Sequence, residues 1–347
     1  MRIGPELATD SNAPIFYVLP KGRVYCNVQF SLLQSLDKVT YTWIAPNGRS
    51  FYKKTLVKRL AQRRTWSWNY IDLSDDRAQG LHGSWRVKVT VNGKRVLVAA
   101  FHVLNDWIQV EKGFLPIIFA CPHGGCVLPA NCRNRTPNQG DDRGCHDTVK
   151  VVQVLKSHLT YMFGASPTVI TCKIHRRWLD VEVEEGDAYQ DEEMAPYYNA
   201  YYECILSSIQ HTLKLQRRKP LLMTFRAHHE LHETIYASTL NGLTLKSMNE
   251  RNEVGDPRFT DEGLNARLAA GRYQLVPANA YQRDDKVFGA GLVVRTFGRD
   301  HAWHTDAIDL ICPRTMVCRE RESKRVREIE RARVCASDGI ERDRESA

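Results

Sequence analysis

Hydrophobic and polar residues alternate in short runs along the first third of the chain. In residues 85–91, every second residue from Trp85 to Val91 is apolar, and the three residues between them are polar. Because successive side chains of a strand point to opposite faces, this alternation predicts a β-strand with one buried face. Asn92-Gly93 follows directly and leads into another strand-like run. This dipeptide suits a tight turn with positive φ, so the pattern predicts a β-hairpin.

Other strand-like runs fill the same region, and Asn47-Gly48 marks a second turn. The expected strands are residues 23–32, 39–44, 66–73, 85–91 and 95–103. Short strands with almost no helix between them are typical of a β-sandwich. We therefore expect residues 15–106 to form a small all-β sandwich that serves as an accessory or packing domain. Trp43, Trp66 and Trp68 fit a buried core and a carbohydrate- or protein-binding surface equally well.

The pattern changes near Val110, where continuous apolar runs alternate with helical spacing. Residues 114–121, 168–172 and 221–225 are apolar runs typical of strands buried on both faces. Residues 149–163 place Val152, Leu155, Leu159 and Met162 on one stripe of a helix, and residues 194–215 are helical as well. This order predicts an α/β domain over residues 110–318, with a mostly parallel mixed sheet flanked by helices. Its site is expected at the carboxyl ends of the strands.

Two histidines occupy positions at that expected edge. His123 lies in a Pro-His-Gly-Gly turn after the first strand, where the glycines let the backbone turn sharply. His228 follows the strand 221–225, and His229 is an alternative to it. The segment 229–233 begins the His-Glu-x-x-His pattern of metalloproteases, but Glu233 replaces the second histidine, which excludes that class.

Three more polar residues near strand ends are candidates for chemistry. Asp147 opens the helix 149–163, and capping of that helix competes with a catalytic or metal-binding role. Arg176 and Arg177 follow the second strand, where a guanidinium group grips a substrate carboxylate through two parallel bonds. Surface ion pairs explain these arginines as well, with Glu182, Glu184 or Glu185 as partners.

Composition limits the class of protein and its location. Hydrophobic residues make up 43% and charged residues 26% of the 347 residues, as in globular proteins. No apolar run approaches the roughly 20 residues of a membrane helix, and no signal peptide is apparent. We therefore expect a cytoplasmic protein with no membrane partner and with reduced thiols. Cys121, Cys126, Cys132 and Cys145 lie close together without the spacing of a zinc knuckle.

The net charge of +9 raises the question of nucleic acid as a partner. In residues 319–333 of the C-terminal tail, which spans residues 319–347, seven basic side chains mix with four acidic ones. This mixture favours a solvated helical face over a nucleic-acid-binding arm. The sequence shows no clustered basic and aromatic patch, so nucleic acid is not expected. The oligomeric state stays open.

Several short segments follow one another in the same order as the motifs of a known protein family. They are the Pro-His-Gly-Gly turn in residues 119–125, Asp147-Thr148, Arg-x-x-x-Asp in residues 176–180, Tyr-x-x-Tyr in residues 198–202, the strand 222–228, and the segments 238–242 and 289–298. On these segments, residues 114–318 resemble the N-formylglutamate amidohydrolase family of zinc carboxypeptidase-like hydrolases. The family has a late strand at the last of these segments. The resemblance implies a zinc carboxypeptidase-like fold.

The resemblance also implies a zinc-bound water that attacks the amide carbonyl of a small N-acyl amino acid, with a carboxylate as general base. His123 and His228 would bind Zn²⁺, with Asp147 or Cys126 as the third ligand. Arg176 or Arg177 would orient an anionic substrate. Ile311 takes the place where the family has its general-base Glu. Asp309 lies two residues earlier, so on a strand its side chain would point to the same face, and it is the candidate base.

Three departures from the family keep a second interpretation open. Cys126 replaces a ligand Glu, Glu182-Val183 replaces an Asn-Arg pair, and Ile311 replaces the base. The alternative is a catalytically degenerate hydrolase domain that serves as a binding or scaffold module.

Overall fold

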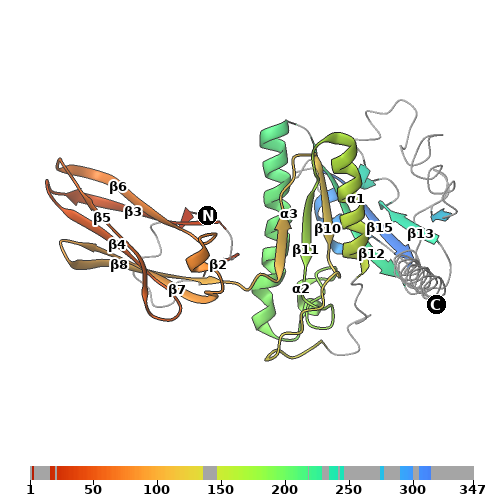
Figure 1. Ribbon diagram of the computed structural model, residues 1–347, viewed down its shortest axis with the longest axis horizontal. Coiled ribbons are helices and arrows are strands. Elements are labelled where there is room, and N and C mark those ends of the chain that lie inside the picture. Colours follow the sequence, from red (N-terminus) through yellow and green to blue (C-terminus); the bar gives the residue numbers. More distant parts are fainter. Residues whose placement is uncertain are drawn as a thin grey trace, which may run out of the picture. The chain divides into compact units, whose positions relative to one another are not determined.

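The computed structural model describes residues 2–3, 16–19, 22–135, 147–217, 219–228, 234–240, 243–245, 274–276, 290–299 and 305–313. The chain divides into two compact units, Met1–Ile108 and Gln109–Ala347 (Figure 1). The C-terminal tail, residues 319–347, lies outside the described residues. No helix among the residues described is long and apolar enough to cross a membrane.

The N-terminal unit contains two β-sheets. The first has the order β1-β3-β6, formed by Arg2–Ile3, Arg23–Leu33 and Gln62–Asp72. The second has the order β2-β8-β7-β4-β5, formed by Phe16–Val18, Lys94–Val103, Gly83–Val91, Lys38–Ile44 and Ser50–Val57. A short 3₁₀ turn, η2 (Asp76–Ala78), follows β6. The expected strands are present, and β1, β2 and β5 are additional to them.

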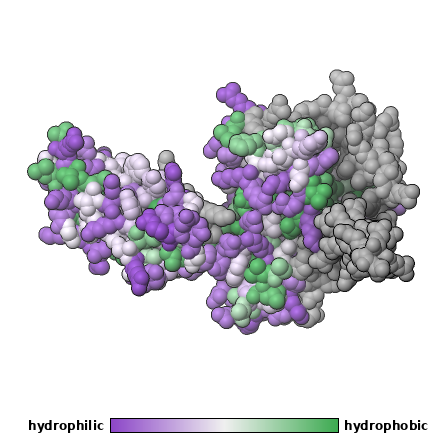
Figure 2. Space-filling view, in the orientation of Figure 1, coloured by the Kyte–Doolittle hydropathy of each residue, from purple (hydrophilic) through white to green (hydrophobic). Residues whose placement is uncertain are grey.

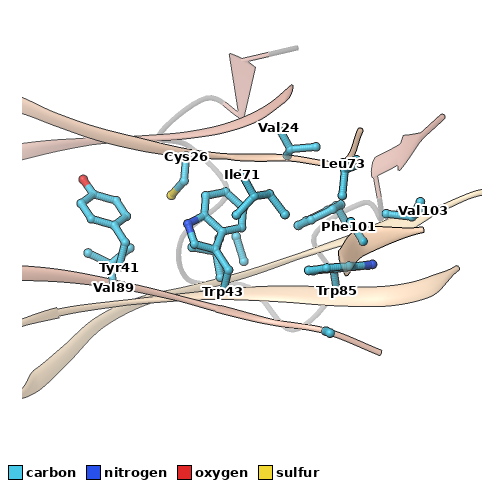
Figure 3. Close-up of a cluster of buried hydrophobic side chains, with 14 of the residues drawn as sticks. Val24, Cys26, Tyr41, Trp43, Ile71, Leu73, Trp85, Val89, Phe101 and Val103 are labelled. Atoms are coloured by element: carbon cyan, nitrogen blue, oxygen red, sulfur yellow. The ribbon is translucent and has the colours of Figure 1, made fainter. Parts of the chain in front are cut away.

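The inner faces of the two sheets enclose an aromatic core, in which side chains from both layers point toward one another (Figure 3). Trp43 and Trp85 are fully buried. Each indole satisfies its N–H: Trp43 donates to Asn69 Oδ1 at 2.9 Å and Trp85 donates to the Leu81 carbonyl oxygen at 2.9 Å. The expected tight turn between β7 and β8 is confirmed, because Asn92 and Gly93 have φ of 49° and 82°.

Two of the three singled-out tryptophans do not belong to this core. Trp66 and Trp68 are 48% and 56% exposed, so a buried position is wrong for both. They lie on β6 at positions that alternate with buried Ser67, and the outward face of the strand therefore holds the indoles.

The C-terminal unit contains a seven-stranded sheet in the order β14-β13-β15-β12-β10-β11-β9. These strands are Gln274–Val276, Thr234–Ser238, Asp306–Pro313, Leu221–His228, Ile117–Cys121, Thr168–Cys172 and Ile108–Glu111. β10 pairs in parallel with β11 and β12, and β12 pairs in parallel with β15. β13 runs antiparallel to β15. The expectation of a mixed α/β unit after a β-rich unit is confirmed.

Helices cover both faces of this sheet (Figure 1). α1 (Asp147–Phe163) packs on the face that includes Phe119 and Phe225. α3 (Ala195–Gln216) and α6 (Leu292–Arg299) cover the other face, and their Tyr202 and Phe297 rings stack with centroids 6.0 Å apart. The short elements α2 (Glu185–Ala188), η4 (Glu192–Met194) and η5 (Leu243–Leu245) complete the described part of the unit.

The segment 289–298 differs from the family expectation of a late strand. Residues Leu292–Arg299 form helix α6, so a strand there is wrong. Leu292, Val293 and Phe297 of this helix are buried. The amides at its start find acceptors, because Gly291 N donates to Asp309 and Leu292 N donates to the Glu182 carbonyl oxygen.

Candidate active site

His123 lies two residues after the end of β10, at the carboxyl edge of the sheet. Its side chain is 1% exposed, and its Nε2 lies 2.8 Å from Asp180 Oδ1. Burial, assisted by the charge of Arg176, lowers the pKa of His123 to about 4. The imidazole is therefore neutral at pH 7. Because the carboxylate accepts, Nε2 holds the proton and Nδ1 keeps its lone pair.

The two glycines after His123 are required by close backbone packing. A Cβ on Gly125 would overlap the backbone of Lys173, and one on Gly124 would overlap the side chain of Val149. The chain then forms a parallel bridge between Val127 and Ile174. The Gly-Gly pair thus lets the turn pass between the segment after β11 and the start of α1, which fixes the place of His123.

Asp180 connects His123 to two arginines. Oδ1 also accepts the backbone N–H of Glu182 at 3.0 Å, while Oδ2 accepts from Arg176 Nε at 2.7 Å and from Arg135 Nη1 at 3.2 Å. Burial opposes ionisation of Asp180, but His123 and Arg176 outweigh it and hold its pKa well below the usual range. Asp180 is therefore a buried carboxylate with four donors.

A second buried charge pair lies on the neighbouring strands β12 and β15. Asp309 is fully buried, and its Oδ1 accepts from Thr224 Oγ1 at 2.6 Å and from Arg226 Nε at 3.1 Å. Its Oδ2 pairs with Arg226 Nη2 and accepts the Gly291 N–H at 2.9 Å. Both oxygens of the candidate base are thus engaged, and they anchor the start of α6.

Glu182 is the buried carboxyl group whose oxygens are not engaged. It is 5% exposed, and neither Oε1 nor Oε2 has a hydrogen-bond partner among the described residues. Burial raises the pKa of Glu182 to about 8, against the opposing charge of Arg226. Its side chain lies against Gly291, where any Cβ would overlap the carboxylate.

The backbone on either side of Glu182 is held by tyrosines of α3. Tyr202 donates its hydroxyl to the Val181 carbonyl oxygen at 2.7 Å, and Tyr198 donates to the Val183 carbonyl oxygen at 3.0 Å. The hydroxyl of Tyr201 is buried without a partner in the described part of the chain. Tyr198 and Tyr202 therefore position the Glu182 backbone.

Of the other expected site residues, some are buried near the edge of the sheet and others are exposed. His228 is the last residue of β12 and is buried, and its Nε2 lies 2.7 Å from the Thr234 carbonyl oxygen. Arg176 joins His123 at Asp180, whereas the side chain of Arg177 is exposed. Cys126 is exposed.

Part of the expected site falls beyond the described side chains. Asp147 begins α1, but its side chain lies outside the described residues, as do His229 and His232. Within the described residues, no group of three or more His, Cys, Asp and Glu side chains is arranged to hold a metal ion.

Sequence reasoning missed several members of this site. Asp180 appeared in it only as a motif residue. Glu182 appeared as a surface ion-pair partner and as part of the pair that replaces the family's Asn-Arg, while Arg135 and Arg226 were not singled out. One signal for Arg226 was available, because a charged residue in an otherwise apolar parallel strand needs a buried partner.

No protein-family model matches the chain, and no curated protein matches it. Among solved structures, an immunoglobulin-like protein from Pseudomonas aeruginosa is 18% identical, over 28% of this chain and 87% of that protein, with a TM-score of 0.21. A gene product of Agrobacterium tumefaciens is 13% identical, over 61% of this chain and 87% of that protein, with a TM-score of 0.39.

An alkylpurine DNA glycosylase from Pseudomonas fluorescens, bound to DNA with an abasic site analogue, is 16% identical over 26% of this chain and 27% of that protein, with a TM-score of 0.20. These TM-scores are too low to establish a shared fold, and the function proposed below does not rest on them.

Proposed function

We propose that the C-terminal unit is a zinc-dependent hydrolase with a zinc carboxypeptidase-like fold, which cleaves the amide bond of a small N-acyl amino acid. The observation that supports this most is the buried contact between His123 Nε2 and Asp180. A metal-binding histidine ordinarily donates its second ring N–H to a carboxylate or a carbonyl group. The buried bond from His123 Nε2 to Asp180 has this form, and the neutral ring has its Nδ1 lone pair for a metal.

His228 fits the same arrangement. A backbone carbonyl oxygen can only accept, so the 2.7 Å contact with Thr234 places the proton of His228 on Nε2. His228 ends β12 and His123 follows β10, and these two strands are adjacent and parallel. Both rings therefore match the donor type that Zn²⁺ prefers. The third ligand is proposed to be Asp147, because the alternative, Cys126, is exposed.

When bound, zinc would supply a polarised carbonyl group and an acidified water. The chain's own residues supply orientation and proton exchange. Asp180 fixes the His123 ring and the guanidinium groups of Arg135 and Arg176. Arg176 is proposed to orient an anionic substrate, because it belongs to this cluster whereas Arg177 is exposed. Of the two buried carboxyl groups, Glu182 is the better candidate than Asp309 to exchange a proton, since its oxygens are not engaged.

A specific observation also favours the second candidate function, a degenerate hydrolase domain that binds without catalysis. Asp309 faces the same side of its strand as Ile311, the position of the family's general base. Its carboxylate is engaged by Thr224, Arg226 and Gly291. Its contacts are those of a structural anchor.

Hydrolysis of N-formylglutamate by the full chain, measured with and without added Zn²⁺ and with a chelator, separates the two functions. The hydrolase proposal predicts zinc-dependent release of formate that is lost in His123→Ala and His228→Ala. The matched control is His158→Ala on the exposed face of α1, which retains activity. Stoichiometric zinc with no turnover of formyl- or acetyl-amino acids would instead support the binding module.

A further inference from the structure

The positive charge of the protein is concentrated in the N-terminal unit. Residues 1–108 contain 16 Lys and Arg against 7 Asp and Glu, a net charge of +9 that equals the charge of the whole chain. Between positions 53 and 64 there are six basic residues and no acidic residue. A β-sandwich with this balance attracts polyanions.

A groove lies beside this basic segment, along the two edge strands β5 and β6. Its volume is about 620 Å³, and its walls include Tyr52, Lys54 and Lys58 from the β5 side and Trp66, Trp68 and Tyr70 from β6. The face of the N-terminal unit seen in Figure 2 is largely hydrophilic or intermediate in hydropathy. The groove itself is lined by lysines and aromatic rings, so it is a mixed basic and aromatic surface.

The aromatic residues of β6 form a row on its outward side. Trp66, Trp68 and Tyr70 occupy every second position and are 48%, 56% and 36% exposed. Neighbours at this spacing are about 6.5–7 Å apart along a strand. The Trp68 and Tyr70 rings lie nearly parallel, with an interplanar angle of 22° and centroids 6.4 Å apart. The Arg23 guanidinium lies over the Tyr70 ring, 5.1 Å from its centroid, so the Trp66 and Trp68 indoles offer the more open faces to a ligand.

The acidic groups of the groove are already neutralised. Asp72 pairs with Arg23 at 3.0 Å, and Asp75 pairs with Arg77 at 2.8 Å. Lys54 and Lys58 have no ion pair with any residue that the structure describes. The features that remain for a ligand are aromatic faces and ammonium charges, which suit stacking bases and phosphates.

We propose that this groove binds single-stranded nucleic acid without strong sequence preference. Bases stack on Trp66 and Trp68, while Lys54 and Lys58 contact phosphates. The reason for expecting no nucleic acid was the missing cluster of basic and aromatic residues, and folding brings that cluster together from β5 and β6. This site is separate from the proposed hydrolase site, which belongs to the other unit.

The test is fluorescence anisotropy of a labelled oligo-dT of about 12 nucleotides, a length within the site sizes known for single-strand-binding OB-folds. The full-length protein is titrated over a series of salt concentrations. Trp66→Ala with Trp68→Ala is expected to weaken binding about 10-fold or more without changing the salt dependence. Lys54→Ala with Lys58→Ala is expected to reduce the slope of log affinity against log salt by about 1.4, because each phosphate contact contributes about 0.7.

Matched controls separate groove effects from general charge and hydrophobicity. Arg86→Ala with Lys88→Ala removes two exposed charges of β7 that do not line the groove, and Tyr161→Ala removes an 89% exposed ring of α1. Both should bind as the parent does, and Trp68→Phe should retain most of the affinity because a ring remains. Equal losses in the control variants, or no binding of oligo-dT at low salt, would overturn the proposal. So would binding of labelled heparin that depends on the two tryptophans while oligo-dT does not bind.

Discussion

The Nε2 atom of His123 lies 2.8 Å from Oδ1 of Asp180, and both side chains are 1% exposed. This contact joins residues 57 positions apart, one from the turn after β10 and the other from the loop that follows β11. Burial makes the contact strongly sensitive to the loss of either partner. It also favours the tautomer with the proton on Nε2, which leaves the Nδ1 lone pair for the proposed metal.

Replacement of Asp180 by Asn is expected to destabilise the protein by about 3–5 kcal/mol, because His123, Arg135 and Arg176 lose a buried anionic partner. Urea denaturation of the C-terminal unit measures this change. Glu203→Gln is the matched control, since that carboxyl group is exposed on α3. A difference below about 1 kcal/mol between the two variants would show that the cluster is not held by Asp180.

Gly291 is expected to tolerate no side chain. A Cβ there would overlap the carboxylate of Glu182, and the same residue donates its N–H to Asp309. We expect Gly291→Ala to cost about 1–3 kcal/mol, the usual range for overpacking a filled interior. Gly186→Ala in α2 is the control, because nothing lies within 4 Å of a Cβ at that position. Equal melting temperatures for the two variants would contradict the close contact between α6 and Glu182.

The pKa of Glu182, raised by burial to about 8 from an ordinary value near 4.5, predicts a pH effect on stability. Between these values the folded state keeps a proton that the unfolded state releases. The free energy of unfolding should therefore fall as the pH rises from about 5 to 8. Glu182→Gln removes this contribution, so its unfolding free energy should fall less over the same range. Parallel pH profiles for the parent and the variant would contradict a protonated Glu182.

Much of the fold could be predicted from local patterns. The hairpin at Asn92-Gly93 follows from turn chemistry, and β11 begins and ends at the expected residues because its apolar run is short and clearly bounded. β5 could not be predicted in this way, since an edge strand exposes both faces and lacks strict alternation. The same limit applies to Trp66 and Trp68, whose exposure depends on which face of β6 packs inward.

The candidate site was predictable only where a motif marks it. The Pro-His-Gly-Gly turn identified His123, and the Arg-x-x-x-Asp spacing matches the bond between Arg176 and Asp180. The Arg226–Asp309 pair, by contrast, joins residues 83 positions apart through the register of β12 against β15. Sequence patterns do not specify which strands become neighbours, so the engagement of Asp309 could not be foreseen.

Zinc content is the measurement that tests the proposed metal site most directly. The full chain is loaded with Zn²⁺, dialysed, and analysed for metal by mass spectrometry, together with His123→Ala, His228→Ala and the exposed control His158→Ala. One zinc per chain is expected in the parent and in His158→Ala, with loss of the metal in the other two variants. Parent protein without zinc, or zinc retained equally by His123→Ala and His228→Ala, would contradict the proposed site.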